Sequence, residues 1–175
     1  MSEQKPAIRY LSEVPRFIDP LSALLNAEFD ISHDGAALVA RRARLESYAV
    51  SGEIPFTRVL TLGEALAGTV SLLNHDLFGL EERYPWGPWM ASLYLLPEYR
   101  GRGWADLLQD DLFRILQLRG IGEVYLWTTD HLVPYYQARN WTGIGSVSYR
   151  GLAAVVMKRG TKGAPVQGGS PPGTV

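Results

Sequence analysis

The apolar residues of the chain follow two spacings, which separate expected helices from expected strands. An apolar residue every three or four positions indicates a helix with one buried face, whereas short β-branched or aromatic runs between turn-forming residues indicate strands. Helices are expected at Pro15–Glu28 with Ser12 as a cap, at Ala36–Tyr48, in a segment that ends at Arg119, and at His131–Arg139. Strands are expected at Ala7–Leu11, Phe56–Leu62, Ala65–Leu73, Trp89–Leu96, Glu123–Thr128, Trp141–Arg150 and Leu152–Arg159.

The order of these elements predicts an α/β fold. Gly63-Glu64 is a hairpin turn signal, so the strands on either side of it should be antiparallel. The strand–helix–strand order across residues 89–128 indicates a βαβ unit, whose two strands run parallel. We therefore expect one domain over residues 1–159: a mixed, mostly antiparallel twisted sheet with a central splayed parallel pair and helices on both faces. Residues 160–175 are rich in Gly, Pro and Ser and are expected to form a disordered tail.

The helix that ends at Arg119 should be amphipathic. Its residues expected to face the sheet are Leu107, Leu108, Leu112, Ile115 and Leu116, and those expected to face water are Gln109, Asp110, Arg114 and Gln117.

Composition and charge exclude several classes of function. The 175 residues are 46% hydrophobic and 20% charged with a net charge of −1, so total charge predicts neither a nucleic-acid nor an anionic-membrane partner. The absence of cysteine excludes disulfides, thiolate metal sites and a cysteine nucleophile. The three histidines lack metal-ligand spacing, so no metal site is expected. No apolar run is long enough to span a membrane, and a soluble cytoplasmic protein is expected.

Residues 93–108, LYLLPEYRGRGWADLL, carry the strongest chemical signal. A strand here runs into a tight turn that opens a helix, and the first N–H groups of a helix lack internal acceptors and attract anions. Gly101 and Gly103 would let a ligand approach the backbone closely. Arg100 and Arg102 add fork-shaped donors suited to phosphate oxygens. This turn is therefore a candidate phosphate site, although neither a complete dinucleotide fingerprint nor a P-loop pattern is present.

Two motifs resemble the GNAT superfamily of N-acetyltransferases. Arg100-Gly101-Arg102-Gly103-Trp104-Ala105 fits that family's Arg/Gln-x-x-Gly-x-Gly/Ala signature. Pro134–Trp141 is similar to its Tyr-x-x-x-Gly-Phe motif, with Asn140 and Trp141 in place of Gly and Phe. The resemblance covers residues 54–159 and implies a GNAT-like fold with acetyl-CoA as the cofactor.

The resemblance also gives the matching residues roles. The cofactor's pyrophosphate would rest on the turn, at Arg100, Gly101, Arg102, Gly103, Trp104 and Ala105. Its pantetheine arm would pair with the strand edge at Leu93, Tyr94 and Leu95, and Thr129 would hydrogen-bond it. The Leu95 N–H would stabilise the carbonyl oxyanion, and Tyr136 would protonate the leaving thiolate, with Tyr135 as the rival donor.

The general base stays open at this point. Some GNAT members carry a glutamate on the strand twelve residues before the tyrosine, where this chain has Val124, which cannot take a proton. The family's asparagine seven residues before the tyrosine is replaced by Thr129. Other candidates, besides a water relay, are Asp130, Glu81, Glu82, His75 and Asp76.

The expected function is transfer of an acetyl group from acetyl-CoA to the primary amine of a small molecule, by direct attack on the thioester. Acidic and aromatic residues in the loop 74–88 and at Asp30–Asp34 suit a cationic amine, or simply pack the loop. The alternatives are acetylation of a protein or peptide amine, and a non-catalytic acyl-CoA-binding or sensing module. A homodimer is a further expectation, and a purely structural dimer module is the third alternative.

Overall fold

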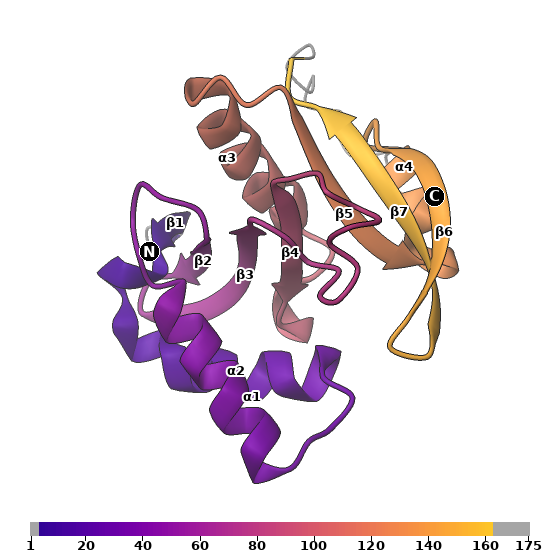
Figure 1. The fold of residues 1–175 in the computed structure, drawn as a ribbon. Coiled ribbons are helices and arrows are strands. Elements are labelled where there is room, and N and C mark those ends of the chain that lie inside the picture. Colours follow the sequence, from indigo (N-terminus) through magenta and orange to yellow (C-terminus); the bar gives the residue numbers. More distant parts are fainter. Residues whose placement is uncertain (1–3, 163–175) are drawn as a thin grey trace, which may run out of the picture.

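The computed structural model describes residues 4–162, which form one seven-stranded sheet flanked by helices (Figure 1). The strands are β1 (Pro6–Tyr10), β2 (Phe56–Leu62), β3 (Ala65–Leu73), β4 (Trp89–Leu95), β5 (Glu123–Thr129), β6 (Thr142–Tyr149) and β7 (Leu152–Gly160). Their order across the sheet is β1-β2-β3-β4-β5-β7-β6. All neighbours are antiparallel except β4 and β5, which are parallel. The expected mixed sheet with one central parallel pair is confirmed.

The helices are α1 (Ile18–Phe29), α2 (Gly35–Ser47), α3 (Trp104–Leu118) and α4 (Val133–Gln137). The first expected helix begins later than predicted, because Leu11–Glu13 and Pro15–Phe17 form two 3₁₀ turns. Ser12 lies within the first of these turns and caps no helix, so that prediction is wrong. The expected helix at His131–Arg139 is also shorter. It starts as a 3₁₀ turn because Pro134, which lacks an N–H, occupies the first turn of α4.

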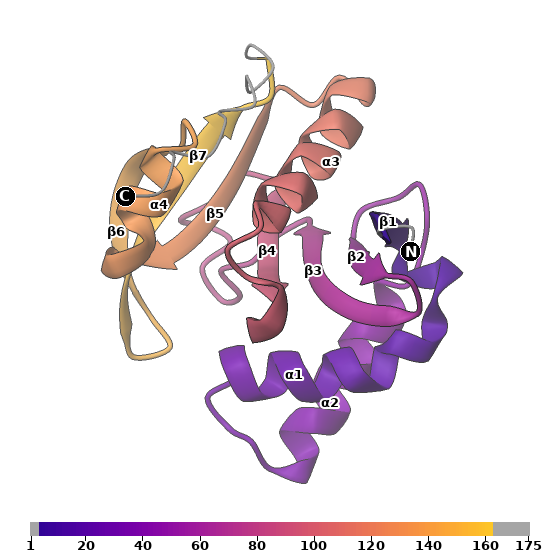
Figure 2. The ribbon, with the colours of Figure 1, turned by 180° about the vertical axis from the view of Figure 1, so that it is seen from behind.

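Helices cover both faces of the sheet. Side chains of α3, including Leu108 and Leu112, pack against Leu60 of β2 in the largest apolar cluster. Leu21 of α1 packs with Val59, the strand neighbour of Leu60, in a separate cluster. Successive strand residues point to opposite faces, so α1 and α3 lie on opposite sides. Figure 2 shows α3 in front of the sheet, and Figure 1 shows it behind.

The loop of residues 74–88 packs on the start of β4 and on the half of the sheet formed by β5, β6 and β7. Leu77 and Tyr84 from the loop are buried against Trp89, Tyr125 and Val156. Gly87 holds the end of the loop close to its start, because a Cβ there would lie 2.4 Å from the backbone oxygen of Asn74. The loop is therefore a packed cover over β4, β5 and β7.

The parallel strands β4 and β5 separate along their length, as Figure 1 shows. They pair only at Trp89 and Tyr125, near the start of β4. Ser92 has a φ of 53°, and the register between β3 and β4 shifts at this level. The irregularity is a β-bulge, which reverses the alternation of side chains and bends the strand. The expected splay of the central pair is thus present, and it leaves one edge of β4 without a strand partner.

Two residues of α3 and the segment that ends the described part of the chain differ from expectation. Gln109 is buried and Leu107 is exposed, the reverse of the prediction from spacing. The reason is a second contact surface: the Gln109 side chain donates a hydrogen bond to the Tyr135 hydroxyl at 3.2 Å, so α4 covers the side of α3 that was expected to face water. Strand β7 extends to Gly160, and Thr161 is buried and donates a hydrogen bond to the Ile121 carbonyl. The rest of the expected tail lies outside the described residues.

Candidate active site

The turn before α3 presents backbone donors to one spot. In residues 4–162, the N–H groups of residues 101–105 find no acceptor, whereas those of Asp106 and Leu107 both donate to the Gly103 carbonyl. Gly101 and Gly103 have φ values of 74° and 75°, in the left-handed region that glycine adopts without strain. A Cβ at either position would meet no protein atom within 4 Å. The turn thus offers free N–H groups under open space, the arrangement that binds a phosphate.

The two arginines of this turn are placed differently. Arg100 points back to the end of β4, where its Nε donates to the Leu95 carbonyl at 3.0 Å. Arg102 lies over the rings of Tyr99 and Trp104, which stack on each other with centroids 5.5 Å apart. Arg100 therefore fixes the end of the strand, and Arg102 keeps its charge at the surface of the turn.

The free edge of β4 faces the gap between β4 and β5. The Leu96 N–H donates to Ala67 of β3 at 3.0 Å, so the N–H of the preceding residue, Leu95, points to the other side, toward the gap. Close packing with β3 holds this edge in position, because a Cβ on Gly68 would lie 2.4 Å from the Leu95 side chain and 2.6 Å from the Tyr94 carbonyl. An extended amide chain could pair here as an added strand.

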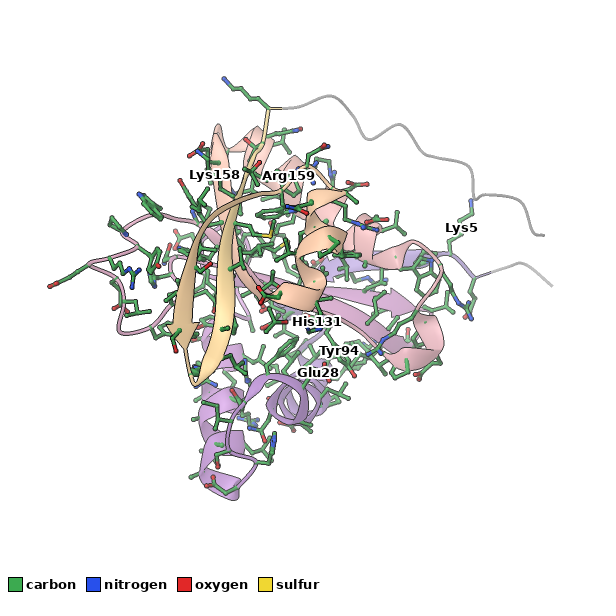
Figure 3. All side chains as sticks on the ribbon, turned by 90° about the vertical axis from the view of Figure 1, so that its right-hand side faces the viewer. Lys5, Glu28, Tyr94, His131, Lys158 and Arg159 are labelled. Atoms are coloured by element: carbon green, nitrogen blue, oxygen red, sulfur yellow. The ribbon has the colours of Figure 1, made fainter. Side chains whose placement is uncertain are left out.

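A cleft of about 360 Å³ opens between the separated strands. Its lining comes from β3, β4, β5, α1, α2, the loop of residues 74–88, the segment 129–136 and the residues around the turn between β6 and β7. Thr129 and Tyr136 both line it, and the Thr129 hydroxyl lies 2.9 Å from His131 Nδ1. Figure 3 labels two of the lining residues: His131, from the segment 129–136, and Glu28, from α1.

The structure separates the two neighbouring tyrosines. Tyr136 lines the cleft, while the Tyr135 hydroxyl is hydrogen-bonded to Gln109 and lies outside the cleft lining. Burial raises the pKa of Tyr136 well above its ordinary value, and the nearby Tyr135 adds to the rise. Tyr136 therefore keeps its proton near neutral pH, as a general acid must before the reaction.

Among the five side chains considered as bases, only Asp76 lines the cleft. Asp130, Glu81 and Glu82 are exposed outside it, and His75 Nε2 lies 2.7 Å from the Tyr84 carbonyl in the packed loop. Burial raises the pKa of Asp76 to about 7, although the Trp127 indole, Arg150 and Arg41 oppose the rise. A carboxylate with this pKa can accept a proton near neutral pH and release it again.

Comparison with known proteins places this geometry in a family. A family model described as the acetyltransferase (GNAT) family matches residues 21–140. The chain belongs to the GNAT family. It is therefore an N-acetyltransferase that uses acetyl-CoA, and the free N–H groups of the turn and the free edge of β4 suit that cofactor. Comparison with curated proteins gives no match.

Solved structures show the same fold at low sequence identity. An aminoglycoside 6'-N-acetyltransferase complexed with coenzyme A is 13% identical, with a TM-score of 0.68 over 91% of this chain and 99% of that one. A GNAT acetyltransferase from Streptococcus pneumoniae is 20% identical, with a TM-score of 0.64 over 89% and 99%. The ribosomal-protein-S18-alanine N-acetyltransferase from Escherichia coli is 13% identical, with a TM-score of 0.63 over 93% and 97%. At these identities the likeness concerns the fold alone.

The loop of residues 74–88 contributes less to the GNAT cleft than its composition indicates. Of its acidic and aromatic residues, Asp76 and Phe78 line the cleft. Tyr84 is buried in the cover over the sheet, and Trp86 stacks on Tyr125 at 5.6 Å. The Glu81 carboxylate accepts a hydrogen bond from the Gly79 N–H within the loop. Packing thus accounts for most of this loop.

Sequence reasoning missed a group of arginines in the cleft. Arg41 and Arg44 of α2 and Arg150 of the β6–β7 turn all line it, and all three lie near Asp30. Arg41 and Arg44 stand three residues apart and therefore on one face of α2. That spacing was visible, but Arg150 comes from a distant turn. In residues 4–162, no three metal-binding side chains cluster, and no helix is long and apolar enough to cross a membrane.

Proposed function

We propose that this GNAT protein acetylates the primary amine of a small molecule in the cleft between β4 and β5. The observation that carries the proposal is the shared lining of that cleft: Asp76 and Tyr136, a candidate base and a candidate acid, border the same space beside the free edge of β4. No other pair among the candidates considered combines these two positions.

Residues of the turn and of β4 would hold the cofactor. The N–H groups of residues 101–105 suit its pyrophosphate, with Arg100 and Arg102 beside them. The β4 edge at Leu93, Tyr94 and Leu95 suits its pantetheine amides, and Thr129 offers a hydroxyl on the opposite strand. These roles follow the family's motif, and the free donors of this chain support them.

Acetyl-CoA supplies, when bound, an acetyl thioester whose carbonyl carbon bonds to the amine nitrogen as the carbon–sulfur bond breaks. Asp76 takes a proton from the incoming ammonium group, which otherwise stays charged near neutral pH. The Leu95 N–H points toward the gap and would donate to the carbonyl oxygen as negative charge develops. The Tyr136 hydroxyl gives its proton to the departing sulfur, and the phenolate then regains a proton from the new amide nitrogen or from water.

The shape of the cleft favours a small acceptor over a peptide. Arg150 of the β6–β7 turn reaches to 4.0 Å from Asp30, which follows α1. The β6–β7 turn and the end of α1 therefore both border the cleft and approach each other there. An extended peptide would need an open groove there, whereas a compact amine fits within about 360 Å³.

The experiment is a panel of small amines and N-terminal peptides, assayed for CoA thiol release, with CoA binding measured by calorimetry. We expect CoA to bind and at least one small amine to release thiol faster than any peptide does. Faster release with peptides would instead support acetylation of a protein amine. CoA binding without release from any acceptor would support a sensing module.

A further inference from the structure

The side of the cleft next to Asp30 holds more guanidinium groups than this carboxylate can bind. Arg41 donates two hydrogen bonds to Asp30, through Nε at 2.9 Å and Nη2 at 2.5 Å, and Asn26 donates a third at 3.0 Å. Burial alone would raise the pKa of Asp30, but these hydrogen bonds and the charges of Arg41 and Arg44 lower it. Asp30 is therefore an ionised carboxylate whose partner is Arg41.

Arg44 and Arg150 are left without a close acceptor. Their nearest approaches to Asp30 are 3.6 Å and 4.0 Å, both beyond hydrogen-bond length. Within residues 4–162, neither guanidinium donates a hydrogen bond to another protein group. Their side chains are 38% and 34% exposed, and both line the cleft. Two forked donors thus face the same space with their hydrogen bonds unused.

Arg150 has a backbone conformation that arginine adopts only with strain, which indicates that its side chain has a role at this position. Arg150 and Gly151 form the two-residue connection between β6 and β7, with φ values of 52° and 74°. Such turns favour Asn-Gly, because both central residues need a positive φ. Arginine at the first position is strained by about 1 kcal/mol, and strain of this kind is often kept at binding sites.

The same lining carries groups of opposite charge. Asp76 and Glu28 border the cleft along with Arg44 and Arg150. A cationic amine suits the carboxylates, and two free guanidinium groups suit an anion with paired oxygens. We infer that the acceptor is a small amine that also carries a carboxylate, as an amino acid does, with the carboxylate bound by Arg44 and Arg150 and the amine directed to Asp76. This inference rests on the proposed function and specifies its substrate class.

The test compares amines that differ only in the carboxylate. The pairs are phenylalanine with phenethylamine, lysine with 1,5-diaminopentane, and 4-aminobutyrate with propylamine, and phosphoethanolamine with ethanolamine tests a phosphate instead. Thiol release with acetyl-CoA gives kcat/KM, and calorimetry of the same compounds with the CoA-loaded protein gives affinity. We expect the best carboxylated amine to exceed its partner about tenfold or more, the effect of a charged hydrogen bond or two.

Two variants from separate elements assign the preference to the arginines. Arg44→Gln removes one guanidinium, and Arg150→Asn removes the other while placing a turn-favoured residue before Gly151. Each should raise KM for the carboxylated amine about tenfold more than for its decarboxylated partner, so the ratio of the two kcat/KM values should fall about tenfold; an altered pKa of Asp76 would change both rates and leave this ratio the same. Arg150→Asn should melt no lower than the natural chain, so its loss of preference cannot come from misfolding. Arg16→Gln, in an exposed ion pair with Glu64 away from the cleft, is the matched control and should change neither value.

Three results would overturn the inference. Decarboxylated amines could be acetylated as well as their partners, phosphoethanolamine could surpass every carboxylated amine, or both arginine variants could keep the preference. If no amine releases thiol, the proposed function fails, and calorimetry still decides the inference: no heat from any carboxylated amine with the CoA-loaded protein counts against it. Heat that Arg44→Gln and Arg150→Asn abolish would support a carboxylate site in a protein that does not transfer the acetyl group.

Discussion

Tyr135 and Tyr136 are adjacent in sequence but face different surroundings. The Tyr135 hydroxyl accepts a hydrogen bond from Gln109, whereas Tyr136 lines the cleft with a raised pKa. Replacing Tyr136 with Phe should lower kcat about 100-fold or more, the usual contribution of a general acid, with CoA affinity unchanged. Steady-state thiol release and calorimetry with CoA measure the two effects. Tyr135→Phe is the matched control, and an equal loss of kcat in both variants would assign the effect to packing.

Asp76 makes activity and stability depend on pH in opposite directions. With a pKa of about 7, it is protonated in acid, so kcat/KM should fall as pH drops below 7, and Asp76→Asn should abolish this dependence and most of the activity. An unfolded aspartate titrates near its model value of 3.8, so the folded state binds the extra proton between about pH 4 and 7. The stability that this proton contributes is present below pH 4 and is lost as pH rises through 7.

Thermal melts across pH check the second half of this prediction. Asp76→Asn should gain stability over the natural chain at pH 8 and little at pH 4, because the variant carries no buried charge at either pH. The same difference in melting temperature at both pH values would show that Asp76 does not titrate near 7. An unchanged pH profile of kcat/KM in Asp76→Asn would remove it as the base.

The sequence predicted some of these residues better than others. The cofactor turn is a contiguous motif, so Gly101 and Gly103 could be identified and fit the free N–H groups that the structure shows. The role of Tyr136 followed from family spacing alone and stays a prediction. Asp76 was one of five candidates, because only the folding of its loop against β5 decides which carboxylate reaches the cleft. Arg150 could not be found, since Asp30, which it approaches, and Arg44, which lines the same cleft, are far away in the chain.

At the scale of elements, α3 offers a matched pair of glycines at its two ends. Gly103 precedes the helix with a φ of 75°, and Gly120 follows it with a φ of 67°. A Cβ on either glycine would meet no protein atom within 4 Å. Alanine at either site should cost about 1 kcal/mol of stability through the left-handed backbone. Only Gly103→Ala should also weaken CoA binding, about tenfold or more, because its Cβ would enter the space above the free N–H groups. Urea unfolding and calorimetry separate the two effects. Equal CoA affinities in both variants would place the pyrophosphate elsewhere.

The buried face of α3 shows where the spacing of apolar residues fails to predict which side chains are buried. A single apolar stripe predicts one contact surface, but α3 touches the sheet through Leu108 and Leu112 and touches α4 through Gln109. It is also tied to β2 by a buried ion pair, in which Arg58 Nε donates to Asp111 at 2.7 Å. Gln109 from the expected water-facing side and Asp111, a polar residue outside the predicted apolar stripe, are both buried, and only the tertiary structure reveals it.

The whole sheet consists of two halves that meet along a short line. Strands β1–β4 and strands β5–β7 join through the single Trp89–Tyr125 pairing, with a backbone hydrogen bond from the Tyr125 N–H to Pro88 at 3.0 Å. Sequence order predicted a parallel pair, and the bulge at Ser92 and the packing of loop 74–88 on only one end of that pair explain how far it opens. A cofactor arm along the β4 edge would supply the missing strand contacts between the halves.

Coenzyme A should therefore stabilise the molecule and protect one strand edge from exchange. The Leu95 N–H, and by alternation that of Leu93, points into the gap without a strand partner, so both should exchange quickly in the free protein and slowly with CoA. Hydrogen–deuterium exchange, read by mass spectrometry on peptides covering residues 89–105, measures this change in exchange rate. Saturating CoA at about 100 times its Kd should also raise Tm by about 5–10 °C. Strand β1, already paired with β2 at the far edge of the sheet, is the internal control: a general rise in stability slows exchange in both places, so residues 89–105 should gain much more protection than β1 does. A rise in Tm without protection at residues 89–105 would mean that CoA binds outside the gap, and the cofactor would then no longer join the two halves of the sheet.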